Sequence, residues 1–117
     1  MQQYEISGTM YEFDNDGFLQ DFKQWNQAVA MEIARRESVS ELTEEHWKVI
    51  NFLRQYFVQN GVAPLPRQLA RETGFNAEKI KQLFPTGVVD GACKVAGLPR
   101  PTWQTYGDRL NPQAREG

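Results

Sequence analysis

One thiol is the group in this sequence best suited to covalent chemistry. Cys93 is the only cysteine of the 117-residue chain; it lies in a stretch rich in glycine and proline, with Lys94 directly after it and Arg100 nearby. The thiolate is the reactive form of cysteine, and neighbouring cations stabilise it and lower its pKa. The opposing interpretation is a buried, inert cysteine, which is common for this residue type. The chemistry of the sequence leaves both open.

Other reactive groups are few. A single cysteine allows neither a disulfide within the chain nor a cysteine-based metal cluster. The only histidine, His46, lies beside Trp47 at the start of an expected helix with no cysteine or aspartate partner nearby, so we interpret it as structural. No acid–base pair, metal-ligand set or phosphate loop is visible. We therefore expect no cofactor and no metal, and a carrier or partner protein more than a self-sufficient enzyme.

Chain length and composition indicate the size of the fold that must position this thiol. A chain of 117 residues with 40% hydrophobic side chains suits one compact domain with a modest core. No apolar run approaches the roughly 20 residues that span a bilayer. The first residues have neither the basic nor the apolar region of a secretory signal. These features favour a cytoplasmic protein.

Charge is divided unevenly along the chain. Residues 1–53 carry four basic and ten acidic side chains, a net charge of −6, whereas residues 54–109 carry eight basic and four acidic ones, a net charge of +4. The basic half could steer toward an acidic partner or nucleic acid. Ordinary surface variation explains the difference equally well.

The N-terminal pattern predicts a hairpin followed by a helix. Residues 2–13 alternate in polarity around Ser7 and Gly8, which is typical of a β-hairpin with a two-residue turn. A turn cluster at residues 14–17 ends it, and a helix is expected over residues 18–36. The apolar side chains on its expected buried face are Phe18, Phe22, Trp25, Val29 and Ile33.

The rest of the chain predicts further helices and then an arm. Thr43 is a good N-cap for a central helix that Gly61 would end. Beyond an extended connector, the helices expected next cover residues 67–73 and 77–84, with one or two helical turns at residues 89–95. The predicted fold is α+β and mostly α: a small N-terminal β-hairpin packed on a helical bundle. We expect residues 1–102 to form one domain and residues 103–117 a flexible C-terminal extension.

The two short helices have the pattern of a helix-turn-helix. Ala70 would allow close approach, Gly74 would make the turn and Ile80 would anchor the second helix. If that helix enters a DNA groove, its polar residues could reach phosphates or base edges. Those residues are Lys79, Lys81 and Gln82. The same pattern is also a common packing device, and the acidic chain lacks the strong basic surface on which DNA affinity depends.

Several stretches together resemble the DsrC/TusE family of small sulfur-relay proteins. The most specific is residues 93–102, Cys-Lys-Val-Ala-Gly-Leu-Pro-Arg-Pro-Thr, preceded by residues 83–87, Leu-Phe-Pro-Thr-Gly. Residues 41–47, Glu-Leu-Thr-Glu-Glu-His-Trp, are similar to the family's central helix. Two further groups of residues also resemble the family. They are Gly17, Phe18, Leu19 and Trp25 in the N-terminal part, and Ala63, Pro64, Arg67 and Leu69 later in the chain. The resemblance covers about residues 4–102.

This resemblance implies sulfur carriage on cysteine, with one departure. Members place a cysteine at the tip of the C-terminal arm, and some pair it with an upstream cysteine. Cys93 corresponds to the upstream residue, whereas Gln104 stands at the tip position. The usual sulfur acceptor is therefore absent. Arg67 matches a basic residue that the family places near the arm, where it would help hold a thiolate or persulfide.

Two functions follow as hypotheses. The first is a sulfur-relay protein that uses Cys93 as a single-thiol acceptor, supported by Lys94 and Arg67. Its partner would be a sulfite reductase, a tRNA-thiolation protein or a related sulfur-transfer protein. The second is a regulatory relative that has lost sulfur transfer and binds DNA or protein through the helix-turn-helix.

Overall fold

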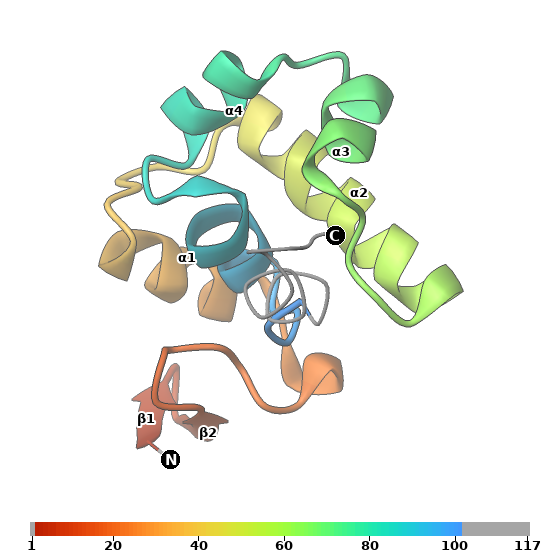
Figure 1. The fold of residues 1–117 in the computed structure, drawn as a ribbon. Helices are drawn as coiled ribbons and strands as arrows, with labels where there is room; N and C mark the ends of the chain where they lie inside the picture. Colours follow the sequence, from red (N-terminus) through yellow and green to blue (C-terminus); the bar gives the residue numbers. More distant parts are fainter. Residues whose placement is uncertain (1, 102–117) are drawn as a thin grey trace, which may run out of the picture.

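The computed structural model describes residues 2–101, in which a small hairpin lies at one end of a group of helices (Figure 1). The elements in chain order are β1 (Gln2–Ile6), β2 (Thr9–Phe13), the 3-10 helix η1 (Phe22–Gln24), α1 (Gln27–Arg36), α2 (Glu44–Asn60), α3 (Pro66–Thr73), α4 (Ala77–Leu83) and the π-helix η2 (Val88–Cys93). The expected α+β fold, mostly α with an N-terminal hairpin, is confirmed. The expected extension at residues 103–117 lies outside the described residues.

The hairpin forms as the sequence predicts. Strands β1 and β2 pair antiparallel, with Ile6 opposite Thr9 at the closed end. Ser7 and Gly8 both have positive φ, at 53° and 86°, which is the backbone of the two-residue turns that match the twist of paired strands. Tyr11 and Phe13 point from β2 into the core.

The helix expected over residues 18–36 is wrong in its first half. The turn expected at residues 14–17 is confirmed, and the Asp14 carboxylate stabilises it by accepting from the backbone N–H groups of Asp16 and Phe18. Leu19 then forms an isolated bridge to Phe13, and only the 3-10 helix η1 precedes α1. The helix α1 begins after Asn26, whose side chain accepts from the Val29 N–H.

The central helix α2 has the ends that the sequence predicts. Thr43 is its N-cap, and Gly61 ends it in the left-handed conformation at φ 75°. One face, with Val49, Ile50 and Leu53, is fully buried. Helix α2 packs against both α3 and η2, so these C-terminal elements are held against the central helix.

The C-terminal elements also follow the predicted order. Helices α3 and α4 meet at Gly74, which has φ 79°, and Asn76 caps α4 by accepting from the Lys79 N–H. Ile80 is buried, as a helix-turn-helix requires. The turns expected at residues 89–95 appear as η2 and one further helical turn. Within the described residues, no helix is long and apolar enough to cross a membrane.

Candidate functional site

Cys93 lies at the end of η2 and is fully buried in the core. Burial raises the pKa of its thiol from an ordinary 9.0 to about 12, because the core disfavours the charged thiolate. The expectation that nearby cations lower this pKa is therefore wrong for the closed structure. In this conformation Cys93 is a neutral thiol shielded from reagents.

Lys94 follows Cys93 in the chain but points elsewhere. Adjacent residues of a helical turn do not share a face, so the two side chains diverge. The Lys94 Nζ lies 3.0 Å from a carboxylate oxygen of Glu37, just beyond α1, and this ion pair is almost wholly buried. Lys94 also lies against Gly17 and over the Phe18 ring. It therefore ties the Cys93 segment to the N-terminal part of the chain.

Two further side chains hold the backbone just after Cys93. The Trp25 indole Nε1–H donates to the carbonyl of Val95 at 2.9 Å. The Arg54 Nη1 donates to the carbonyl of Ala96 at 2.8 Å. Gly97 then passes so close to Trp25 that a Cβ there would lie 2.4 Å from the ring. The chain beyond the thiol is therefore fixed by α2 and by the segment before α1.

Arg54 is itself held by aromatic rings. Its guanidinium lies 3.8 Å from the Phe22 ring centroid and 4.1 Å from that of Trp25. A second guanidinium nitrogen donates to the Phe22 carbonyl. Burial lowers the pKa of Arg54 to about 10, which leaves it charged at neutral pH. The cation therefore serves as a fixed donor for the Cys93 segment.

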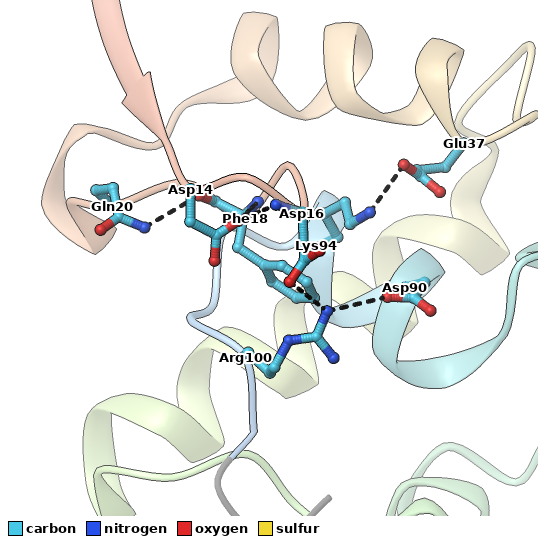
Figure 2. A network of polar contacts seen from close by, with 8 residues as sticks. All are labelled: Asp14, Asp16, Phe18, Gln20, Glu37, Asp90, Lys94 and Arg100. Carbon is cyan, nitrogen blue, oxygen red and sulfur yellow. Dashed lines mark hydrogen bonds and ion pairs between the residues drawn. The ribbon is translucent and has the colours of Figure 1, made fainter. Parts of the chain in front are cut away.

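A second polar cluster surrounds Arg100, close to the end of the described chain (Figure 2). Its Nη2 lies 3.0 Å from an Asp16 carboxylate oxygen and 3.8 Å from one of Asp90. The guanidinium also lies 4.8 Å from the centroid of the Phe18 ring, which contacts Lys94 as well. Arg100 thus links the turn before α1 to η2.

Arg67 lies exposed in the first turn of α3. Cys93, by contrast, is enclosed in the core, so in this conformation the thiol cannot use a side chain directed to solvent. The predicted role of Arg67 beside a thiolate or persulfide stays a prediction that requires an opened structure.

The residues proposed for nucleic-acid or partner contact lie on α4. The Lys79 Nζ forms an ion pair with Glu45 of α2 at 2.8 Å and lies near the Phe75 ring. Lys81 and Gln82 are exposed. Because Lys79 is paired with Glu45 within the fold, less positive charge is available on α4 to bind phosphates.

A hollow of about 700 Å³ lies away from Cys93, between β1, α1 and the chain leading to α2. Ile6, Met31, Leu42 and Trp47 supply apolar surface there. Glu5, Glu32, Glu41 and Arg35 supply charged groups, of which Glu32 and Arg35 are paired with each other.

His46 is a structural residue, as interpreted from the sequence. The Thr43 N–H donates to its Nδ1 at 3.0 Å, so the proton resides on Nε2. That Nε2–H donates to the Leu83 carbonyl at 2.8 Å. The histidine thus caps α2 and fastens the end of α4. Among residues 2–101, no cluster of three or more histidine, cysteine, aspartate or glutamate side chains could hold a metal ion.

Sequence reasoning missed the groups that hold the thiol segment: Glu37, Trp25, Arg54, Asp16 and Asp90. Glu37 and Lys94, for example, are 57 residues apart. Only tertiary packing brings them together. The one available signal was charge: Asp16 and Glu37 are acidic residues of the acidic first half, whereas Lys94 and Arg100 belong to the basic second half.

Comparison with known proteins supplies the family context. A family model described as "DsrC like protein" matches residues 5–103. The chain is 40% identical over 102 residues to "Sulfite reductase, dissimilatory-type subunit gamma" of Nitratidesulfovibrio vulgaris, covering 87% of this chain and 97% of that protein. It is 38% identical over 104 residues to "Sulfurtransferase TusE" of Sodalis glossinidius, covering 83% and 95%.

A solved structure agrees with the sequence relatives. The crystal structure of the oxidized gamma-subunit of the dissimilatory sulfite reductase from Archaeoglobus fulgidus superimposes with a TM-score of 0.80. It is 42% identical, and the match covers 86% of this chain and 96% of that one. None of these similarities supports DNA binding.

Proposed function

The chain belongs to the DsrC-like family, and from this premise we propose that it is a sulfur-relay protein that carries sulfur on Cys93. The single observation that carries this proposal is that Cys93 is the only thiol of a chain whose relatives are named for sulfite reduction and sulfur transfer. Any persulfide on this protein must therefore form at that residue.

The proposed step is a transfer of one sulfane sulfur atom. The Cys93 thiol first loses its proton to water, and the thiolate attacks the outer sulfur of a donor persulfide, R–S–SH. A new S–S bond forms on Cys93 while the donor's S–S bond breaks, and R–S⁻ leaves. The products are Cys93–S–SH and the donor thiolate, with no net oxidation. The reverse reaction with an acceptor thiolate unloads the sulfur.

Buried Cys93 must become accessible for this step to occur. In the closed structure the core encloses the thiol and raises its pKa, so a donor meets a neutral and shielded group. We propose that opening of the segment around η2 exposes the thiol, and that Lys94 and Arg67 then stabilise the thiolate or persulfide. Lys94 would leave Glu37 to do so.

The partners are proposed from the relatives. A sulfite reductase fits the gamma-subunit relative, and a tRNA-thiolation or related sulfurtransferase complex fits the TusE relative. The absence of a tip cysteine means that the partner's donor or acceptor group must come to Cys93. That requirement distinguishes this chain from a relay in which the arm carries the sulfur outward.

Sulfur loading can be tested directly by intact mass. The reduced protein is incubated with sodium polysulfide, freed of excess reagent and weighed before and after dithiothreitol. We expect adducts that differ by single sulfur atoms, removed by the reductant. Cys93→Ala should show none, because it has no other thiol.

A folded protein that gains no sulfur would overturn the carrier proposal. Wild-type protein in urea serves as the positive control, because its exposed thiol should load readily. Arg67→Gln tests a supporting role: it should slow loading of the folded protein while leaving loading in urea unchanged. Lys94→Gln does not give this test, because it also breaks the buried pair with Glu37 that holds the segment closed.

A further inference from the structure

Arg100 binds across the two sides of the thiol segment. It lies seven residues after Cys93, yet its guanidinium pairs with Asp90, three residues before Cys93, and with Asp16 in the N-terminal turn. Figure 2 shows the three side chains converging from the turn, η2 and the chain that leaves it. One cation therefore fastens both ends of the Cys93 segment to residues 14–18.

The Phe18 ring gives this contact a platform. Phe18 is fully buried, and the Arg100 guanidinium and Lys94 ammonium both lie over its ring, at 4.8 Å and 5.1 Å from the centroid. The turn that presents the ring is fixed by the Asp14 carboxylate, which accepts from the Phe18 N–H. The Asp14 carboxylate accepts the turn's hydrogen bonds, which leaves the Asp16 carboxylate to pair with Arg100.

The two cations differ in how solvent reaches them. The Lys94–Glu37 pair is almost wholly buried, and breaking a buried pair is costly. The Arg100 side chain is 31% exposed, and its partners Asp16 and Asp90 are 61% and 50% exposed. Exposed pairs are weak and are screened by salt. The Arg100 contacts with Asp16 and Asp90 are therefore weaker than the Lys94–Glu37 pair and open first.

We propose that Arg100, Asp16 and Asp90 form a charge-sensitive latch that holds the segment around Cys93 closed, and that its release exposes the thiol. The latch gains its biological meaning from the proposed sulfur-relay function, since it regulates access to the same residue. An acceptor or donor protein that offers an acidic group to Arg100 would open it. Cys93 would then become exposed only while such a partner is bound.

The latch can be tested by alkylation of the only thiol. N-ethylmaleimide is uncharged, so its encounter with the protein is insensitive to salt, and each labelling event seen by intact mass reports exposure of Cys93. Arg100→Gln should raise the labelling rate about tenfold, the effect expected from loss of a partly exposed ion pair and a cation–π contact. Raising the salt concentration should accelerate labelling of wild type but not of Arg100→Gln.

Global unfolding must be separated from latch release. Labelling through a local opening depends weakly on urea, because little surface is exposed, whereas labelling through global unfolding depends steeply on it. We expect the weak dependence in Arg100→Gln at low urea. A steep dependence with a rate set by the global stability would overturn the proposal.

A charge exchange keeps the test independent of any single damaging substitution. Asp16→Arg alone should accelerate labelling, and Asp16→Arg combined with Arg100→Asp should restore slow labelling in part, because the exchanged pair replaces one contact while Asp90 then faces a like charge. Glu72→Gln is the matched control, because it removes an exposed carboxylate near Arg71 in α3 and should change nothing. Failure of the charge exchange to restore protection, or equal acceleration by Glu72→Gln, would contradict the latch.

Failure of the latch and failure of sulfur carriage give different results. If polysulfide loads the folded protein but labelling is indifferent to Arg100, carriage stands and the latch falls. If labelling responds to Arg100 but the folded protein takes up no sulfur, the latch stands as a structural contact and the carrier proposal falls.

Discussion

At the scale of single residues, Gly97 shows how tightly the thiol segment is held. Its φ is 79°, a conformation that strains other residues, and the Trp25 ring occupies the space that a side chain would need. Trp25 in turn donates to Val95. A glycine is thus required at this position for two separate reasons.

We expect Gly97→Ala to lower the free energy of unfolding by about 2–5 kcal/mol, combining left-handed strain with a clash in a packed site. Gly61→Ala is the control, because Gly61 has nearly the same φ but nothing within 4 Å of its would-be Cβ. It should cost only about 1–2 kcal/mol. Urea titration of both variants measures the difference, and equal losses would show that the Trp25 contact is unimportant.

The environment of Cys93 illustrates what residue types can and cannot predict. The sequence singled out the thiol as the one nucleophile, which stays a prediction, and it placed Lys94 beside the thiol because they are neighbours in the chain. In a helical turn neighbouring side chains diverge, and Lys94 reaches Glu37 instead. Direction within an element is settled by packing that a local pattern does not contain.

At the scale of elements, one histidine joins two helices. His46 accepts from the Thr43 N–H at the start of α2 and donates to the Leu83 carbonyl at the end of α4. The bond to the Leu83 carbonyl is buried, whereas Thr43 is exposed, so the Leu83 carbonyl is the group that depends most on His46. The bond to Leu83 ties the α4 end, and so the start of the chain toward η2, to the central helix.

We expect His46→Leu to destabilise the fold by about 2–3 kcal/mol, because it leaves the buried Leu83 carbonyl without its donor and also removes the bond to the Thr43 N–H. Asn76→Ala is the comparison: it removes the cap of α4 alone and should cost about 1 kcal/mol. Thermal or urea unfolding followed by circular dichroism measures both. A His46→Leu loss no larger than that of Asn76→Ala would contradict the linking role.

Local signals predicted the elements well where they are self-contained. Thr43, Gly61 and Gly74 are cap and turn residues whose effect needs only a few neighbours, and all three act as expected. The helix expected over residues 18–36 failed in its first half because Leu19 bridges to Phe13 and the Gln20 N–H donates to the Glu12 carbonyl, which holds these residues beside β2. The apolar spacing in that stretch still marked core residues, although they come from a turn, η1 and α1.

At the scale of the whole molecule, ion pairs link the acidic first half of the chain to the basic second half. Lys94 pairs with Glu37, Lys79 with Glu45 and Arg100 with Asp16, so each contact joins the basic second half to the acidic first half. Attraction between the halves thereby contributes to closing the fold. Net charge along the sequence pointed to this asymmetry but not to its partners.

Alkaline pH should destabilise the molecule through its one thiol. The pKa of Cys93 is raised to about 12 in the folded state against 9.0 when exposed, so between these values the unfolded chain releases a proton that the folded chain keeps. The resulting stability is complete below pH 9 and is lost as pH rises toward 12, at up to about 1.4 kcal/mol per pH unit.

Cys93→Ala isolates this effect, since all other titrating groups are shared. The difference in unfolding free energy between wild type and Cys93→Ala, measured by urea titration, should be constant below pH 9 and shrink or reverse above it. A difference that stays constant to pH 11 would show that the thiol is not shielded in solution.

Burial of the only thiol also imposes a speed limit. A donor can react only with molecules in which Cys93 is momentarily open, so adding more donor accelerates loading until every opening is used. Beyond that concentration the rate equals the frequency of opening and becomes a property of the protein alone. If Cys93 carries sulfur as proposed, the contacts that enclose it therefore set the greatest amount of sulfur that one molecule can transfer in a given time, whatever the concentration of donor.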